Sequence, residues 1–199
     1  MTNSDRITWF TIPHEADLDE DLAKLFAKAR EKIGFVPNVF AVFMVRPSHF
    51  RPWFNHFREL MQGPSALSVA EREMIAVAVS AENHCLYCLV SHGAELRLAL
   101  DDEVLGDRIT LDYRRAGLDP RTTAMLDYAV KLTCQPVACS QDDIAQLQTH
   151  GFSEEAIFDI AEVAAMFNFT NRMASATGML PNREYHGLGR GMGGGKVRG

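Results

Sequence analysis

The sequence predicts an all-α protein. Apolar residues recur every three to four positions in several segments, as they do on one face of an amphipathic helix. Helix start signals, such as Ser68 with Glu71, and stop signals, such as Gly34, flank these segments. The sequence has no convincing period-two alternation and no hairpin dipeptide between β-branched runs, so no sheet is required. We therefore expect a compact helical fold.

The N-terminal third contains two expected helices and an apolar stretch. The first helix covers residues 17–32 and ends at Gly34, because glycine readily adopts the left-handed conformation that terminates helices. The apolar stretch 39–45 follows it. The second helix opens at Ser48 and closes at Gly63, which a proline follows.

The central segment carries the clearest helix start. Ser68 and Glu71 form a capping box, in which each side chain can satisfy a free backbone amide of the other residue, so a helix is expected from about Val69. Asn83 is a candidate cap for the next helix, over residues 85–98. A break or kink at Asn83 and a continuous helix both remain open.

The C-terminal part predicts three further helices, over residues 120–133, 140–150 and 153–179. Pro120 suits the first position of a helix, and Gly151 ends the second of the three. Ser140 and Ser153 are candidate caps for the second and third helices.

The domain organisation expected is one helical domain over residues 1–186. No linker composition and no internal repeat interrupts this range. The final stretch, 187–199, contains seven glycines and almost no apolar side chains. Burying it would not offset the conformational entropy lost on ordering, so we expect a flexible tail.

The composition excludes several classes of function. The chain has 199 residues, 47% hydrophobic and 23% charged, which is typical of soluble globular proteins. Lys and Arg number 20 against 26 Asp and Glu, so no basic field exists to attract nucleic acid. No apolar run approaches the roughly 20 residues that cross a bilayer, and the polar N-terminus lacks a signal-peptide core. We expect a cytoplasmic location, with neither nucleic acid nor a membrane as partner.

The cysteines indicate a chemical site. Four are too few for a disulfide-built scaffold, and they form two close pairs, Cys85-x-x-Cys88 and Cys134-x4-Cys139. Cys85, Cys88 and His92 stand at positions i, i+3 and i+7, within roughly 60° of one another on a helix. Such a thiol pair can close a disulfide, and the imidazole can take or return the proton that separates thiol from thiolate. The pattern predicts redox chemistry.

The two thiols differ in their expected surroundings. If Asn83 is the cap, Cys85 lies in the first helical turn, where free amides and the helix dipole favour a thiolate. Cys88 lies deeper and closer to His92. Glu73 precedes Cys85 by twelve residues, about 18 Å along a straight helix, so it joins the site only if the chain turns or a partner subunit contributes.

Simpler interpretations stand beside the redox one. Cysteines are common as small buried hydrophobic residues, and an isolated glutamate such as Glu73 usually faces solvent. Two thiolates and an imidazole also supply three of the four ligands of a zinc site, with Glu73, Glu82 or His84 as the fourth. The second cysteine pair lacks a nearby histidine, which disfavours a closed zinc site.

The segment 67–93 contains the pattern Glu-x11-Cys-x2-Cys-x3-His, formed by Glu73, Cys85, Cys88 and His92. It resembles the alkylhydroperoxidase D-like branch of the carboxymuconolactone decarboxylase superfamily. The stretches Gly34-Phe35-Val36-Pro37-Asn38 and Phe167-Asn168-Phe169-Thr170-Asn171-Arg172 are similar to its peroxidase-related subgroup. The resemblance covers about residues 12–179. It implies an all-helical homo-oligomer, a trimer or a hexamer, with the CxxC pair at the N-terminal end of a helix.

The resemblance also implies thiol-dependent reduction of hydroperoxides, with an external dithiol or protein as reductant. Cys88 would attack the peroxide as a thiolate and become a sulfenic acid, and Cys85 would condense with it to a disulfide. Glu73 and His92 match the proton-relay positions of the family. Tyr87 stands where the best-known hydroperoxidases of the family carry a second histidine, which implies a shorter relay.

No cofactor is expected in this chain, neither metal nor flavin nor nicotinamide. The glycines of Gly189-x-Gly191-x-Gly193 belong to the expected tail rather than to a turn after a strand. A non-catalytic or zinc-binding helical protein is the alternative of a different class, and a carboxymuconolactone decarboxylase-like enzyme is the third. The decarboxylase branch generally lacks the CxxC pair. Asn168, Asn171 and Arg172 are assigned no catalytic role.

Overall fold

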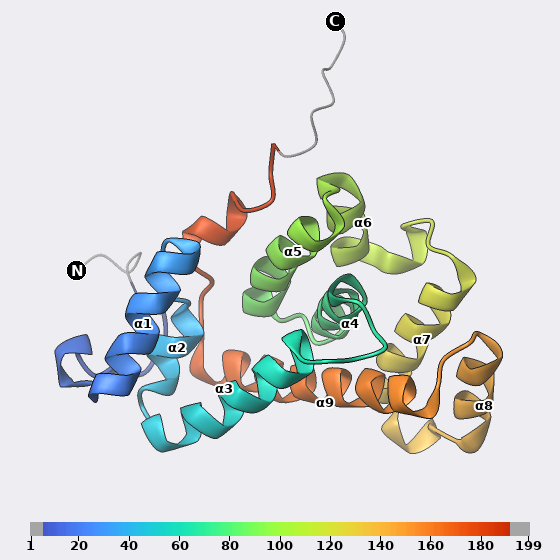
Figure 1. Ribbon diagram of the computed structural model, residues 1–199, viewed down its shortest axis with the longest axis horizontal. Coiled ribbons are helices and arrows are strands. Elements are labelled where there is room, and N and C mark those ends of the chain that lie inside the picture. The colour runs from blue at the N-terminus through green and yellow to red at the C-terminus, as the bar shows by residue number, and fades with distance from the viewer. Residues whose placement is uncertain (1–5, 192–199) are drawn as a thin grey trace, which may run out of the picture.

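The structure, a computed structural model, describes residues 6–191 and is built from helices (Figure 1). No strand occurs in this part of the chain, which confirms the predicted all-α class. None of its helices combines the length and apolar character that a membrane span requires. The α-helices are α1 Glu20–Ile33, α2 Asn38–Phe43, α3 Pro47–Gln62, α4 Val69–Glu82, α5 Leu86–Leu100, α6 Glu103–Asp112, α7 Pro120–Cys134, α8 Gln141–Thr149 and α9 Glu154–Thr177.

Helix α4 forms the centre of the fold, packed against α5, α6, α7 and α9 (Figure 1). Every residue from 72 to 80 is buried, as expected for a helix that is apolar on nearly all sides. The predicted capping box is present. The Glu71 amide donates to Ser68 Oγ at 3.2 Å, and the Ser68 amide donates to Glu71 Oε2 at 2.7 Å.

A tight turn separates α4 from α5. His84 has a left-handed φ of 50°, its amide donates to Ala81 O, and the Cys85 amide donates to Ser80 O at 3.0 Å. These bonds form a Schellman motif, which satisfies the last carbonyls of α4. The suggestion that Asn83 caps the second helix is wrong, because Asn83 ends α4 and Cys85 is the N-cap of α5.

Helix α6 was not predicted from the sequence. Asp102 caps it by accepting hydrogen bonds from the amides of Val104 and Leu105. Gly106 sits inside it, which disguises the helix in sequence because glycine weakens helical propensity. The reason for the glycine is packing, since a Cβ there would lie 2.8 Å from Arg97 Cγ on α5.

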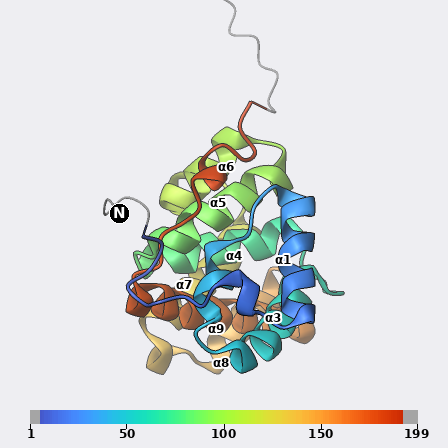
Figure 2. The same ribbon diagram turned by 90° about the vertical axis from the view of Figure 1, so that its left-hand side faces the viewer.

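The N-terminal segment lies beside the end of α9 (Figure 2). The Trp9 amide donates to Thr177 O at 2.9 Å, and the Leu180 amide donates to Ile7 O at 3.0 Å. Gly178 has a φ of 60°, and a Cβ there would lie 2.2 Å from the indole of Trp9. Glycine is therefore required at position 178 both by its left-handed backbone and by the close approach of the ring.

The C-terminal segment returns along α5 and is held by Arg97, which is only 6% exposed. Its guanidinium donates to Leu188 O at 2.9 Å and to Tyr185 O at 3.2 Å, and it lies 3.2 Å from Asp107 Oδ1. Most of the tail expected over 187–199 lies outside the described residues. Its flexibility and the domain limits at 1–186 stay predictions.

Replacing Arg97 with leucine should lower the free energy of unfolding by about 2 kcal/mol, because the carbonyls of Tyr185 and Leu188 lose a charged donor. Urea unfolding followed by circular dichroism measures the change. Arg108→Leu is the matched control, since Arg108 is exposed on the neighbouring helix α6. Equal destabilisation by the two substitutions would show that Arg97 does not hold the C-terminal segment.

Candidate active site

The turn between α4 and α5 brings Glu73 and His92 into contact. Glu73 Oε2 lies 2.7 Å from His92 Nδ1, and the two side chains are 8% and 15% exposed. The sequence left two possibilities for Glu73, a turn of its own chain or a contribution from a partner subunit. The structure shows the turn. No partner subunit is needed to form this pair.

The surroundings of His92 favour its protonated form. Burial acts to lower the pKa of His92, but the negative charge of Glu73 and the hydrogen bond to it outweigh that effect, so its pKa is raised. The ring of Phe167 packs edge-on against the imidazole at 4.6 Å between centroids, and Phe57 packs at 5.9 Å. These rings keep the ion pair away from solvent.

Cys85 and Cys88 are free thiols, both almost fully buried. A hydrogen bond from the Cys88 thiol lowers the pKa of Cys85 to about 7 against the opposing effect of burial, and the amides of Cys88 and Tyr87 add to the lowering. The same shared proton, together with burial, raises the pKa of Cys88 well above its usual value. Cys85 is thus the more acidic thiol, as its place at the start of a helix predicts.

A network of amide side chains ties the turn to α9. Asn171, 1% exposed, donates to Ser80 Oγ at 3.0 Å, while Asn83 Nδ2 donates to Asn171 Oδ1 at 2.9 Å. Asn171 also hydrogen-bonds to the thiol pair and stabilises the charged form of Cys85. From the sequence, Asn171 was assigned no catalytic role. The available signal was an amide on the apolar face of the helix expected over 153–179.

Tyr87 does not stand in for the missing histidine as a base. Its side chain is buried, and its hydroxyl accepts a hydrogen bond from the Val39 amide at 3.2 Å. Burial raises the pKa of Tyr87 well above its usual value, so the phenol stays protonated. Tyr87 instead holds α2 against the start of α5.

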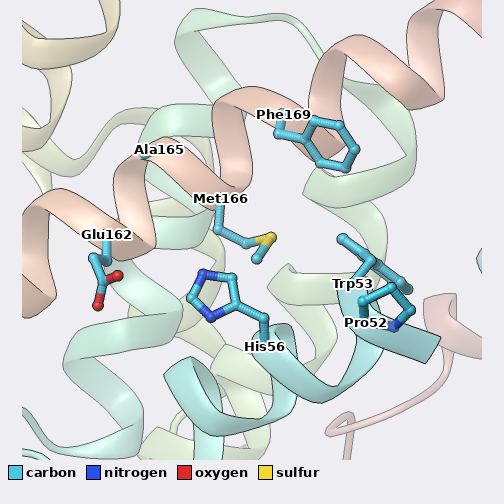
Figure 3. A pocket seen from close by; sticks show the side chains of 7 residues that line it. All are labelled: Pro52, Trp53, His56, Glu162, Ala165, Met166 and Phe169. Carbon is cyan, nitrogen blue, oxygen red and sulfur yellow. The ribbon is translucent and has the colours of Figure 1, made fainter. Parts of the chain in front are cut away.

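Two hollows lie near α9. One, of about 450 Å³, is lined by Cys85 and by residues of the N-terminal segment and the end of α9. The other, of about 370 Å³, lies between α3 and α9 and contains none of the predicted site residues (Figure 3). It is lined by Pro52, Trp53, His56, Glu162, Ala165, Met166 and Phe169.

The residues considered as zinc ligands are not gathered around one point. Glu82 forms an ion pair with Arg114 at 3.1 Å, and His84 is exposed. Between residues 6 and 191, no three side chains of His, Cys, Asp or Glu are grouped as a metal would require.

Comparison with known proteins identifies the family of this chain. The Carboxymuconolactone decarboxylase family matches residues 47–110. A peroxidase-related protein from Ralstonia eutropha, with an alkylhydroperoxidase AhpD core, is 40% identical and superposes with a TM-score of 0.90, over 93% of this chain and 97% of its own. The chain belongs to the alkylhydroperoxidase D-like branch of the carboxymuconolactone decarboxylase superfamily.

The chain is also similar to a peroxidase-related protein from Silicibacter sp. It is 43% identical, with a TM-score of 0.90 over 96% of this chain and 100% of its own. The debrominase Bmp8 shares the fold at 17% identity, with a TM-score of 0.74 over 92% and 95% of the two chains. No curated protein matches the sequence significantly. The chain therefore shares its fold and family with peroxidase-related proteins.

The acidity of Cys85 should depend on a hydrogen-bond donor at position 88. In a Cys134→Ser, Cys139→Ser background, thiolate absorbance should show one thiol that titrates near pH 7. Cys88→Ala should raise the pKa of Cys85, whereas Cys88→Ser, which keeps a donor hydroxyl, should raise it less. An unchanged pKa in Cys88→Ala would contradict the assignment.

Proposed function

We propose that this protein is a thiol-dependent peroxidase that reduces organic hydroperoxides with the Cys85–Cys88 pair. One arrangement carries the proposal: two buried free thiols, one of them ionised near neutral pH, stand at the start of the helix that also carries His92 paired with Glu73. The peroxidase-related names of its relatives support the same reaction.

The first step oxidises one thiol. A cysteine thiolate attacks the terminal oxygen of the hydroperoxide, the O–O bond breaks, and the alkoxide takes up a proton and leaves as an alcohol. The cysteine becomes a sulfenic acid. The family pattern assigns this attack to Cys88, whereas the more acidic thiol of this chain is Cys85.

The second step closes the disulfide. The remaining thiol attacks the sulfenic sulfur, the S–O bond breaks, and hydroxide leaves with the thiol proton as water. Cys85 and Cys88 stand three residues apart at the start of α5, so their side chains can meet within one helical turn. An external dithiol or protein dithiol then reduces the disulfide by thiol–disulfide exchange.

The Glu73–His92 pair supplies and recovers protons in this scheme. The raised pKa of His92 makes the imidazolium available to protonate a departing alkoxide or hydroxide. Glu73 keeps that imidazolium oriented and balances its buried charge. His92 lies one turn beyond Cys88 on the same helix, where side chains four residues apart are neighbours, so in this scheme its imidazole recovers the proton of that thiol.

Assembly and location stay predictions. A homo-oligomer, a trimer or a hexamer, is what the family resemblance implies, and the cytoplasmic location is an expectation from the sequence.

Stoichiometric organic hydroperoxide should convert reduced, metal-free protein to a form lighter by two hydrogens. Peptide mapping should confine the change to a Cys85–Cys88 disulfide and leave Cys134 and Cys139 open to alkylation. A Cys134→Ser, Cys139→Ser variant is the control and should react at the same rate. Unchanged thiols would reject the peroxidase and favour a non-catalytic helical protein.

The pH profile of kcat/KM should be bell-shaped. Its acid limb should fall near pH 7, where Cys85 gains its proton, and its alkaline limb should follow loss of the proton of His92. Glu73→Gln removes the charge that raises the pKa of His92, so the alkaline limb should move to lower pH.

The same Glu73→Gln variant should lower kcat/KM by about 10²-fold, the usual contribution of a positioned acid–base group. Glu155→Gln, an exposed residue of α9, is the matched control and should keep the wild-type profile. An unmoved alkaline limb in Glu73→Gln would show that the pair takes no part in proton transfer.

A further inference from the structure

Two polar side chains of α9, Thr170 and Asn171, lie against the thiols of α5. They are only 8% and 1% exposed. Ala174, one turn further along α9, packs in the same buried cluster as Cys85 and Cys88. Thr170 forms a hydrogen bond to Cys88, and Asn171 forms one to each thiol. Helix α9 thus brings hydrogen-bonding groups to both sulfur atoms.

The orientation of the Asn171 amide is fixed by two neighbours. Its Oδ1 accepts a hydrogen bond from Asn83 Nδ2 at 2.9 Å, and its Nδ2 donates one to Ser80 Oγ at 3.0 Å. An amide nitrogen carries two hydrogens and only donates, so one N–H remains for the thiols. Asn171 is therefore arranged to stabilise a thiolate.

The Thr170 hydroxyl is held only weakly by another acceptor. Its hydrogen bond to the Phe167 carbonyl is 3.3 Å long, against about 2.7 Å for a typical bond between two oxygens. A hydroxyl hydrogen can rotate from one acceptor to another. When Cys88 is ionised, the hydroxyl is free to donate to its sulfur, and bonds to a charged acceptor are roughly twice as strong as neutral ones.

The acidity of Cys88 depends on which thiol holds the shared proton. The hydrogen bond with Cys85 raises the pKa of Cys88, as do burial and the negative charge of Cys85. The first and the last of these effects exist only while Cys85 is the thiolate. When Cys85 holds the proton, burial alone opposes ionisation of Cys88, and Thr170 and Asn171 favour it.

We propose that Thr170 and Asn171 stabilise Cys88 as the attacking thiolate. The thiolate forms when the shared proton moves to Cys85, so no base outside the pair is needed. The proposal rests on the peroxidase function above and keeps the order of thiols that the family pattern implies. It reconciles that order with the acidity of Cys85, because the pair loses one proton near pH 7 and either sulfur can carry the resulting charge.

The chemistry balances with the groups present. The proton of Cys88 passes to Cys85 along their hydrogen bond. The Cys88 thiolate then gives two electrons to the terminal peroxide oxygen, the O–O bond breaks, and the alkoxide takes a proton from the His92 imidazolium. The Cys85 thiol attacks the sulfenic sulfur of Cys88, and its proton leaves with hydroxide as water. An external dithiol restores both thiols.

The Thr170 contact is tested first without peroxide. In a variant that keeps Cys88 and has serine in place of the other three cysteines, thiolate absorbance gives the pKa of Cys88 directly. Thr170→Val removes the hydroxyl and keeps the shape, so it should raise this pKa by about one unit, as expected for the loss of one hydrogen bond to an ion. Thr177→Val is the matched control at another buried hydroxyl of α9 and should leave the pKa unchanged. An unchanged pKa in Thr170→Val would overturn the role of Thr170.

The Asn171 contact is tested in two backgrounds, one that keeps only Cys88 and one that keeps only Cys85. Asn171→Ala should raise the pKa of both thiols, because its amide contacts both. Asn168→Ala is the control, since Asn168 also accepts a hydrogen bond from Asn83 and is not among the groups that bond to the thiols. Unchanged pKa values in a folded Asn171→Ala would remove Asn171 from the site. If Asn171→Ala does not fold, Thr170→Val decides the proposal.

The attack itself is measured with cumene hydroperoxide and a dione reagent that labels sulfenic acids. Of the two single-cysteine variants, the one that keeps Cys88 should be labelled faster. Thr170→Val should slow its labelling about threefold near pH 7, because a tenfold loss of thiolate is partly offset by the greater nucleophilicity of a thiolate of higher pKa. The same substitution should not slow the labelling of Cys85, because the contact of Thr170 is with Cys88.

The outcomes separate the proposal from the function on which it rests. Faster labelling of Cys85, or equal slowing of both thiols by Thr170→Val, would overturn the proposal and leave the peroxidase function standing. If neither thiol is labelled and the wild-type thiols are also inert to the hydroperoxide, the peroxidase function fails and the order of attack fails with it. The absorbance titrations still show in that case whether the two side chains of α9 stabilise the Cys88 thiolate.

Discussion

The buried contact between Glu73 and His92 depends on the turn between α4 and α5, and the rest of the site depends on that turn. A continuous helix would hold Glu73 about 18 Å from Cys85 along its axis. The Schellman motif at residues 83–85 instead folds α5 back along α4, so that a carboxylate and an imidazole nineteen residues apart meet at 2.7 Å. The same motif makes Cys85 both the last residue of the α4 cap and the N-cap of α5.

Burial explains why these groups come as pairs. An isolated carboxylate or imidazolium inside the helical core would lose its hydration without compensation, which is costly unless an opposite charge replaces it. The thiols follow the same rule. The Cys85 thiolate is a buried negative charge, and hydrogen bonds from the Cys88 thiol and from the first amides of α5 stabilise it. Asn171 extends this support from α9, so the position of the thiol pair depends on packing between three helices.

The sequence predicted what is encoded locally. Periodicity and capping gave the helical class and the start of α4, and the spacing of Cys85, Cys88 and His92 placed them on one helix face. The contact of Glu73 with His92 could not be read from spacing, because it depends on the direction of the chain after Asn83. Asn171 was missed for a related reason: it lies far along the chain in another helix, and an amide on an apolar face indicates only some buried hydrogen bond. Helix α6 was not recognised in the sequence because Gly106 lowers its helical propensity. Glycine occurs there because it lets Arg97 pack closely against the helix.

The central claim is that the Cys85–Cys88 pair transfers two electrons to a hydroperoxide. Its most direct test is a single turnover in which reduced protein meets one equivalent of organic hydroperoxide in the absence of any reductant, with the alcohol product and the remaining thiols both quantified. The account predicts one alcohol formed for each chain that loses two thiols, and no alcohol from a Cys85→Ser, Cys88→Ser variant. Alcohol formation that persists in that double variant, or thiol loss without alcohol, would contradict it.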